Sequence, residues 1–247
     1  MQKESKEGLL YKYNYITYPN IKAPSNFIKQ NTWIQFLFLV DWGLIKEFFE
    51  NIDFGPFPIK FINWITPFPN ENIESYATRI STPLINENAI IIGLSFGGIL
   101  GIEISKIKKI KKLILISSAK TKFELPLIFR MVGLCRLNKL FPNNILKHKN
   151  LVTSWLFGIE SDKDGRLFKT ILRDVDPAFL KWAINAVVNW QNETIPANCF
   201  HIHGRQDRVL PLKNIKADFI VETGGHFMTV NRSEEIGSLI RTSCATK

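Results

Sequence analysis

Blocks of apolar residues follow one another along the chain with the lengths and spacings of alternating strands and helices. Apolar runs of strand length occur at 36–40, 58–64, 89–92, 112–117, 199–203 and 217–221. Between and after them, residues 44–51, 71–80, 95–106 and 233–241 have apolar side chains at helical spacing. Strands that are apolar throughout are typical of a sheet covered by helices on both faces. The pattern predicts an α/β fold with a mostly parallel central sheet.

The alternation is interrupted once. Residues 121–197 form a long stretch of mostly helical pattern that is rich in large apolar side chains. We therefore expect a core made of residues 33–120 and 198–247, with 121–197 inserted as a helical cap or lid. Residues 1–32 show no clear periodicity and form an N-terminal segment that we leave unassigned.

Composition limits the classes of protein to consider. The chain has 247 residues, the length of one large α/β domain. Its net charge of +10 suggests nucleic acid or membrane as partners. Five lysines lie within 106–112, but no nucleic-acid motif accompanies them. We interpret this cluster as a solvated helix end, and the charge as a solubility feature, with no nucleic-acid partner.

The apolar segments and the spacing of the cysteines indicate in which cellular compartment the protein is expected. The apolar run at 33–40 is far shorter than the roughly 20 residues that span a bilayer. Three widely spaced cysteines, Cys135, Cys199 and Cys244, form no C-x-x-C pair. We expect a cytoplasmic protein without a membrane span, a disulfide framework or a zinc site.

The most informative motif is Gly93-Leu94-Ser95-Phe96-Gly97-Gly98. It has the pattern G-x-S-x-G, and it lies between a predicted buried strand and a predicted helix, where a nucleophile elbow occurs. A serine on such a turn exposes its hydroxyl above the sheet, and the helix N-terminus behind it stabilises developing negative charge. Ser95 is therefore our candidate nucleophile.

A serine hydroxyl needs a base, and the base needs an acid that orients it. Asp207 follows one predicted strand in His203-Gly204-Arg205-Gln206-Asp207, and His226 follows the next in Gly224-Gly225-His226. The chain order Ser, Asp, His is the order that this architecture requires. Since both loops follow strand ends, we expect them at the same sheet edge as Ser95.

Other polar residues are weaker candidates. Asp174 and Asp176 are rival acids, but the position of Asp176 before Pro177 favours a helix start. His201 and His203 alternate on one strand, so one of them faces the core or a neighbouring loop. His148 lies among lysines in the insertion and is expected to be solvated.

With these motifs the chain resembles the α/β-hydrolase superfamily, and most of all its small bacterial helical-capped hydrolases and esterases. The resemblance covers residues 33–242 and includes the segment 115–119. It implies an α/β-hydrolase fold in which Ser95 is the nucleophile, His226 the general base and Asp207 the acid. It also implies that the backbone N–H of Phe96 is one oxyanion-hole donor.

One segment departs from the family pattern. The family has a His-Gly or Gly-rich loop after the strand equivalent to 36–40, and that loop supplies the second oxyanion donor. Here Asp41-Trp42-Gly43 follows instead. Trp42 or Gly43 is the candidate second donor, and the Asp41 carboxylate would oppose an oxyanion unless it points away.

The resulting function hypothesis is a serine hydrolase that acts on a carboxylic ester, or a related acyl bond, of a small hydrophobic substrate. Thioester, lactone or C–C cleavage would use the same residues. The alternative is a non-catalytic or weakly active protein of this fold that binds a small ligand. Motifs for nucleotide cofactors and catalytic zinc are missing, so we expect no cofactor. The oligomeric state stays open.

Overall fold

The computed structural model describes residues 34–37, 49, 51–55, 57, 59–82, 87–135 and 151–245. Its strands are β1 (Ile34–Leu37), β2 (Ile59–Ile62), β3 (Ile90–Leu94), β4 (Lys112–Ile116), β5 (Cys199–Gly204) and β6 (Phe219–Val221). Its α-helices are α2 (Ile73–Ser81), α3 (Phe96–Ile107), α4 (Leu127–Leu134), α5 (Leu151–Phe157), α6 (Asp162–Asp174), α7 (Pro177–Val188), α8 (Met228–Asn231) and α9 (Ser233–Ala245). Short 3₁₀ turns occur at Lys122–Glu124 and Leu212–Asn214.

The strands form one sheet in the order β2-β1-β3-β4-β5-β6, and every neighbouring pair is parallel. The predicted parallel sheet is thus confirmed. The expected strand at 36–40 is described only as β1, because 38–40 lie outside the described residues. The expected helix at 44–51, apart from Phe49 and Asn51, and the segment 1–32 also lie outside them.

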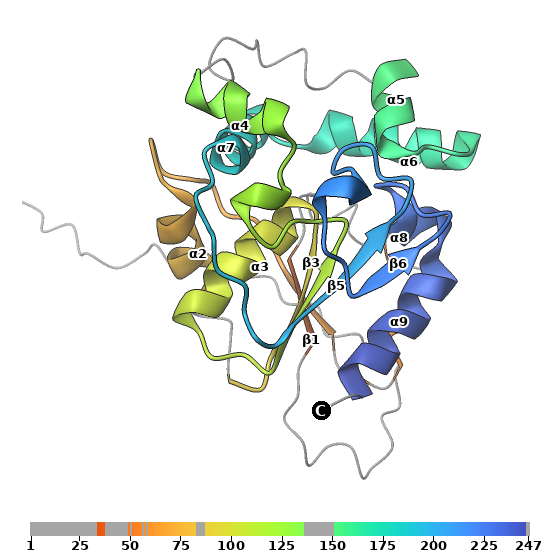
Figure 1. Cartoon of the computed structure of the whole chain (residues 1–247), viewed down its shortest axis with the longest axis horizontal. Helices are drawn as coiled ribbons and strands as arrows, with labels where there is room; N and C mark the ends of the chain where they lie inside the picture. Colours follow the sequence, from red (N-terminus) through yellow and green to blue (C-terminus); the bar gives the residue numbers. More distant parts are fainter. Residues whose placement is uncertain are drawn as a thin grey trace, which may run out of the picture.

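Alternating side chains of the central strands enter two separate cores. On β3, Ile90 and Ile92 pack in the core that contains Ile236 and Ile240 of α9. Ile91 points the other way, into the core that contains α2 and α3. A strand buried on both faces must be apolar throughout, which explains the continuous isoleucine run. Figure 1 shows α2 and α3 on one side of the sheet and α9 on the other.

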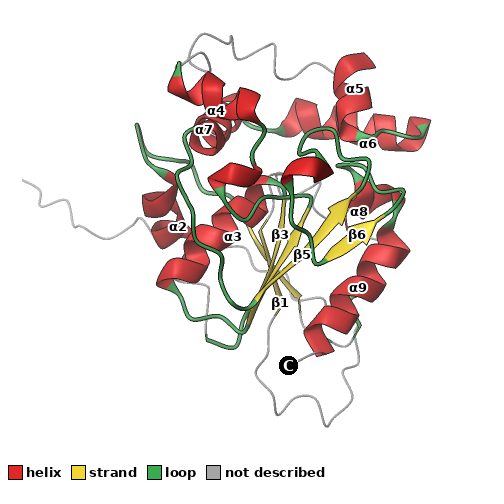
Figure 2. Ribbon diagram, in the orientation of Figure 1, coloured by secondary structure: helices red, strands yellow, loops and turns green. Residues whose placement is uncertain are grey.

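The described part of residues 121–197 contains four α-helices. Helices α4, α5, α6 and α7 interrupt the sheet between β4 and β5. Figure 2 shows them together beyond the carboxyl ends of the strands. We call these four helices the cap. Asp176 starts α7 by accepting a hydrogen bond from the Ala178 N–H, so the helix-start interpretation of Asp176-Pro177 is confirmed.

Candidate active site

Ser95 occupies a sharp turn between β3 and α3. Its φ of 51° and ψ of −119° are strained for a residue with a side chain. Its N–H donates to the Ile116 carbonyl at 2.9 Å, which ties the turn to β4. A Cβ on Gly93 would lie 2.5 Å from the Gly97 carbonyl oxygen, so only glycine fits at that position. The turn therefore has the geometry of the predicted elbow.

Ser118, two residues beyond the end of β4, supports this turn. Its hydroxyl donates to the Ser95 carbonyl oxygen at 2.7 Å. Gly98, on the first turn of α3, packs directly against it, because an added Cβ would lie 2.6 Å from Ser118 Cβ. This contact gives the second glycine of the Gly97-Gly98 pair a specific role, which the sequence pattern alone did not reveal.

Asp207 lies in the loop after β5, and its side chain is buried. Its Oδ1 accepts hydrogen bonds from the backbone N–H groups of Val209 and Leu210, at 2.9 and 2.8 Å. Burial by itself raises the pKa of this carboxyl. The charge and hydrogen bond of His226, with help from His203 and the Leu210 N–H, outweigh burial and hold the pKa below its ordinary value. Asp207 is thus an ionised carboxylate at neutral pH.

His226 links the acid to the serine. Its Nδ1 lies 2.8 Å from Asp207 Oδ2, and its Nε2 lies 3.0 Å from Ser95 Oγ. An ionised carboxylate only accepts hydrogen bonds, so Nδ1 carries the proton. In the neutral imidazole Nε2 is then an acceptor aimed at the serine hydroxyl. The three residues that the sequence pattern singled out are therefore in contact, in an arrangement suited to removing the serine proton.

A second pair of imidazoles lies behind the acid. His203 Nε2 lies 2.8 Å from the Leu210 carbonyl oxygen and 3.6 Å from Asp207 Oδ2. Since a carbonyl only accepts, neutral His203 is protonated at Nε2, and its Nδ1 accepts from His201 Nε2 at 3.2 Å. Burial lowers the pKa of both histidines, and that of His201 falls well below its ordinary value. The sequence predicted that one of these histidines faces the core or a neighbouring loop; in the structure both are buried and their rings contact each other.

Cap residues complete the surroundings of the site. The ring of Phe157, at the end of α5, packs edge-on against the His226 imidazole with centroids 5.3 Å apart. The buried Phe96 ring, next to Ser95 in the chain, packs edge-on against Phe179 and Trp182 of α7, at 6.3 and 5.7 Å. Sequence reasoning expected an apolar lid but did not identify these three cap residues, because helical spacing does not show which turn faces the site.

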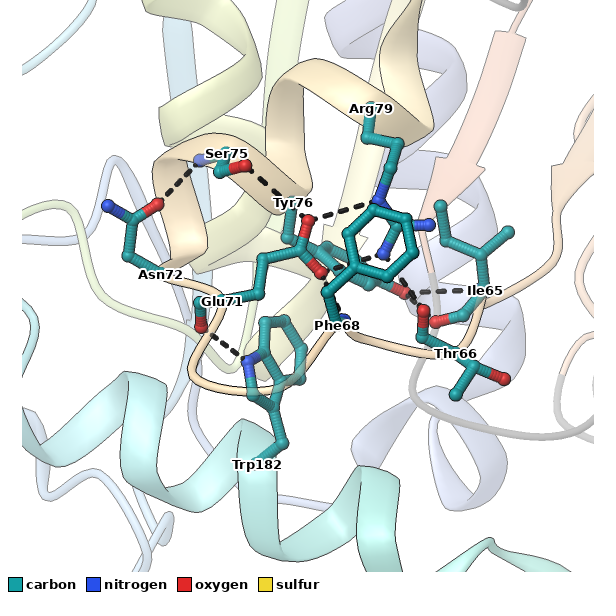
Figure 3. Close-up of polar contacts among 9 residues, drawn as sticks. All are labelled: Ile65, Thr66, Phe68, Glu71, Asn72, Ser75, Tyr76, Arg79 and Trp182. Carbon is teal, nitrogen blue, oxygen red and sulfur yellow. Dashed lines mark hydrogen bonds and ion pairs between the residues drawn. The ribbon is translucent and has the colours of Figure 1, made fainter.

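A cluster on the β2–α2 segment anchors α7 beside the elbow. The Trp182 indole N–H donates to the Glu71 carbonyl oxygen at 2.8 Å (Figure 3). The Glu71 carboxylate is held by Arg79 at 2.7 Å, and the Arg79 guanidinium stacks 4.1 Å above the Phe68 ring. Burial raises the pKa of Glu71, but the bonds from Arg79 outweigh it and lower the pKa overall. Tyr76 completes the cluster by donating to the Ile65 carbonyl at 2.9 Å.

Of the candidate oxyanion donors, only Phe96 lies among the described residues. Phe96 is the first residue of α3, and the first N–H groups of a helix have no partner inside it. Asp41, Trp42 and Gly43 lie outside the described residues, as does His148. The second donor therefore stays a prediction.

The remaining candidates lie elsewhere or have other partners. Asp174 pairs with Arg173 at the end of α6. Within the described ranges, no group of three or more His, Cys, Asp or Glu side chains could hold a metal ion, and no helix is long and apolar enough to cross a membrane. All three cysteines are free thiols, and burial raises the pKa of Cys199 to about 12 and that of Cys244 to about 11.

No family model and no curated protein sequence matches the chain. Solved structures do. A lipase-esterase related protein from Clostridium acetobutylicum matches with a TM-score of 0.66 and 15% identity, covering 93% of this chain and 98% of that one. The esterase EaEST from Exiguobacterium antarcticum matches with a TM-score of 0.66 and 13% identity, over 88% and 93%. Est816, described as an N-acyl homoserine lactone degrading enzyme, matches with a TM-score of 0.63 and 18% identity, over 93% and 95%.

At such low identity the likeness concerns the fold and not the activity. Together with the parallel sheet and the elbow, it places the chain in a known architecture. The protein has the α/β-hydrolase fold that its motifs predicted.

Proposed function

We propose that the protein is a serine hydrolase that cleaves a carboxylic ester, or a closely related acyl bond, of a small hydrophobic substrate. The proposal rests on one observation. Ser95 Oγ lies 3.0 Å from His226 Nε2, while His226 Nδ1 lies 2.8 Å from an ionised Asp207. Ser95 is also partly exposed, so a substrate can reach it.

Each residue has a defined task in this reaction. Ser95 Oγ attacks the carbonyl carbon of the ester, and its proton passes to His226 Nε2. Asp207 holds the imidazole in the Nδ1–H tautomer and stabilises the imidazolium that forms. The Phe96 N–H, at the positive end of α3, stabilises the oxyanion of the tetrahedral intermediate.

The intermediate then expels the leaving alkoxide, which takes the proton from His226 and departs as the alcohol. Water attacks the acyl-enzyme, and His226 accepts a proton from it and returns one to Ser95. The acid product leaves with Ser95 restored. Atoms and charges balance with water as the only co-reactant.

The cap contacts favour an apolar acyl or alkyl group. Phe157 packs on His226, and Trp182 packs on Phe96, so two partly buried aromatic rings of the cap lie beside residues of the site. Such walls bind hydrocarbon and exclude water. The names of the esterase-like neighbours fit an ester substrate, and the name of Est816 fits a lactone, which is a cyclic ester.

Labelling by a fluorophosphonate probe tests the proposal, because this probe reacts only with an activated serine. We expect the native protein and Ser105→Ala to be labelled and Ser95→Ala to be unlabelled. Ser105 is a matched control on α3, where its hydroxyl binds only the Ile102 carbonyl within the described residues. The native protein and Ser105→Ala should also hydrolyse p-nitrophenyl esters, and Ser95→Ala should not. Equal labelling of all three proteins, or no hydrolysis of any ester, would favour a non-catalytic ligand-binding protein instead.

A further inference from the structure

Helix α4 is apolar on both of its sides. Its sequence from Leu127 to Leu134 contains a single charged or polar residue, Arg130. The inner side packs on α7, where Gly133 lies so close to the Val188 backbone that a Cβ would overlap it. Figure 1 shows α4 against α7 at the outer edge of the cap. A helix that is apolar all round belongs in a core or at an apolar surface.

The outer side of α4 faces solvent. Leu127, Ile128, Met131 and Leu134 are 64, 61, 51 and 85% exposed. Their spacing of one, three and three residues places them in one stripe along the helix. We call these four residues the α4 outer face. A stripe of four exposed large apolar side chains is a feature of interaction sites and not of ordinary surfaces.

Positive charge is concentrated in the same part of the chain. Residues 121–158 contain six Lys or Arg and one acidic residue, Glu124, which is +5 of the total +10. Glu124 is buried and accepts hydrogen bonds from the backbone N–H groups of Lys120 and Lys216. The stretch therefore presents no carboxylate to solvent.

The cations and the apolar stripe are contiguous at Phe123. This exposed ring lies 5.7 Å from the Arg130 guanidinium and 5.2 Å from the Lys122 ammonium, which also pairs with Glu193. Aromatic rings beside cations at the border of an apolar stripe are typical of surfaces that lie at a lipid headgroup layer.

We propose that the α4 outer face is a docking site for the surface of an anionic lipid bilayer. The four apolar side chains enter the boundary between headgroups and acyl chains, and Arg130 and Lys122 bind the anionic headgroups. A bilayer of this kind offers hydrocarbon and negative charge on one continuous surface. These two properties complement the apolar stripe and the cations of this face. Binding is peripheral, and none of these α4 side chains takes part in the proposed catalysis, so the two proposals can be tested separately.

Co-sedimentation of the full-length protein with vesicles tests this proposal. One vesicle is pure phosphatidylcholine, and the other contains about one third phosphatidylglycerol. We expect binding to the anionic vesicle and at least about tenfold weaker binding to the neutral one, since each basic residue near the surface contributes about 1 kcal/mol. Salt at about 1 M, where the Debye length is about 3 Å, should weaken binding.

Matched variants separate this face from other exposed groups. Leu127→Gln/Leu134→Gln should weaken vesicle binding at least about tenfold, and Arg130→Gln about fivefold. Ile107→Gln/Ile195→Gln removes two apolar side chains that are 48 and 53% exposed elsewhere, and it should bind as the native protein does. Lys109→Gln, in the 106–112 cluster, changes the net charge equally and should also leave binding intact.

Ser95→Ala should bind vesicles normally, so a failure of the proposed hydrolysis does not affect this test. The proposal is wrong if neither vesicle is bound, if both are bound equally, or if the control variants lose as much binding as the α4 variants. Self-association in solution that Leu127→Gln/Leu134→Gln abolishes, without vesicle binding, would assign the face to a second copy of the chain instead.

Discussion

Phe157 and His226 come from segments almost 70 residues apart, yet the Phe157 ring stands edge-on to the imidazole at a centroid distance of 5.3 Å. The backbone strengthens this contact, because the Phe227 N–H donates to the Phe157 carbonyl oxygen at 3.0 Å. The adjacent Gly158 and Gly225 also touch, so that a Cβ on Gly158 would lie 3.2 Å from Gly225 Cα. The end of α5 and the loop of the base are therefore one packed unit.

Phe157→Ala removes one wall of the imidazole and should lower kcat. An edge-on aromatic contact contributes about 0.5–1.5 kcal/mol beyond its buried area, which corresponds to a loss of about two- to tenfold. Steady-state kinetics on a p-nitrophenyl ester measures this loss. Trp155→Ala is the control, since Trp155 lies on the same helix but is 58% exposed. Equal kinetics for both variants would contradict a role of Phe157 in holding the base.

Asp207→Asn should lower kcat by about 10⁴, because an amide can donate to His226 Nδ1 and so stabilise the wrong tautomer. The rate of fluorophosphonate labelling should fall together with kcat, while the circular dichroism spectrum stays that of the native protein. Asp174→Asn removes the rival acid of the insertion and should have no effect on either rate. A full loss of activity in Asp174→Asn would reverse the assignment of the acid.

The buried His201–His203 pair predicts a pH dependence of stability. Burial lowers the pKa of both imidazoles in the folded protein, so that they stay neutral while the unfolded chain takes up protons below its ordinary pKa of about 6.5. The unfolding free energy is therefore highest above pH 6.5 and falls as the pH drops below it, by up to about 1.4 kcal/mol per pH unit for each histidine.

Urea unfolding between neutral and mildly acidic pH measures this slope. His201→Gln and His203→Gln should each have a shallower slope than the native protein, whatever their stability at neutral pH. If the unfolding free energy of the native protein did not change below pH 6.5, these imidazoles would have to be protonated in the folded state as well.

Gly98→Ala should destabilise the protein by about 1–3 kcal/mol, because the new methyl group overlaps the Ser118 side chain. Ser118→Gly removes that side chain, so the double variant Gly98→Ala/Ser118→Gly should recover part of the loss. It should still turn over more slowly than the native protein, since the hydrogen bond to the Ser95 carbonyl is gone. Thermal unfolding and ester hydrolysis together test this, and additive losses in the double variant would refute the overlap.

Two tryptophans allow a comparison of neutral and charged hydrogen-bond acceptors. Trp182 donates to the Glu71 carbonyl, and Trp190 donates to the buried carboxylate of Glu103 at 2.7 Å. Bonds to neutral groups contribute about 0.5–1.5 kcal/mol and bonds to charged groups about 1.5–3 kcal/mol. Trp190→Phe should therefore lower the unfolding free energy more than Trp182→Phe, and the reverse order in urea titrations would contradict this comparison.

Sequence patterns predicted the sheet well where both faces of a strand are buried. The isoleucines of β3 and β4 leave no alternative to a central strand, and the glycines around Ser95 fit only a tight turn. Asp207 and His226 were found because short loops after parallel strands must lie at the same edge. Chain order and strand ends thus determined the candidate triad before any distance was known.

Sequence patterns did not predict the contacts between segments that are distant in the chain. Nothing in the pattern of α5 distinguishes the partly buried Phe157, which contacts His226, from the exposed Trp155, because both are aromatic residues on a seven-residue helix. The link from Ser118 to Ser95 depends on strand register, which periodicity does not give. For the same reason periodicity does not show which side of α4 is exposed, since that side is defined only once the other is packed on α7.

The order of the sheet also bears on how the protein is made. Strand β5 pairs with β4, although the whole cap separates them in the chain, and β6 is added outside β5. During synthesis from the N-terminus, the residues of β3, the serine turn and β4 are translated well before Asp207 and His226. Ser95, the proposed nucleophile, therefore has neither proposed partner until the loops after β5 and β6 bring Asp207 and His226 to it.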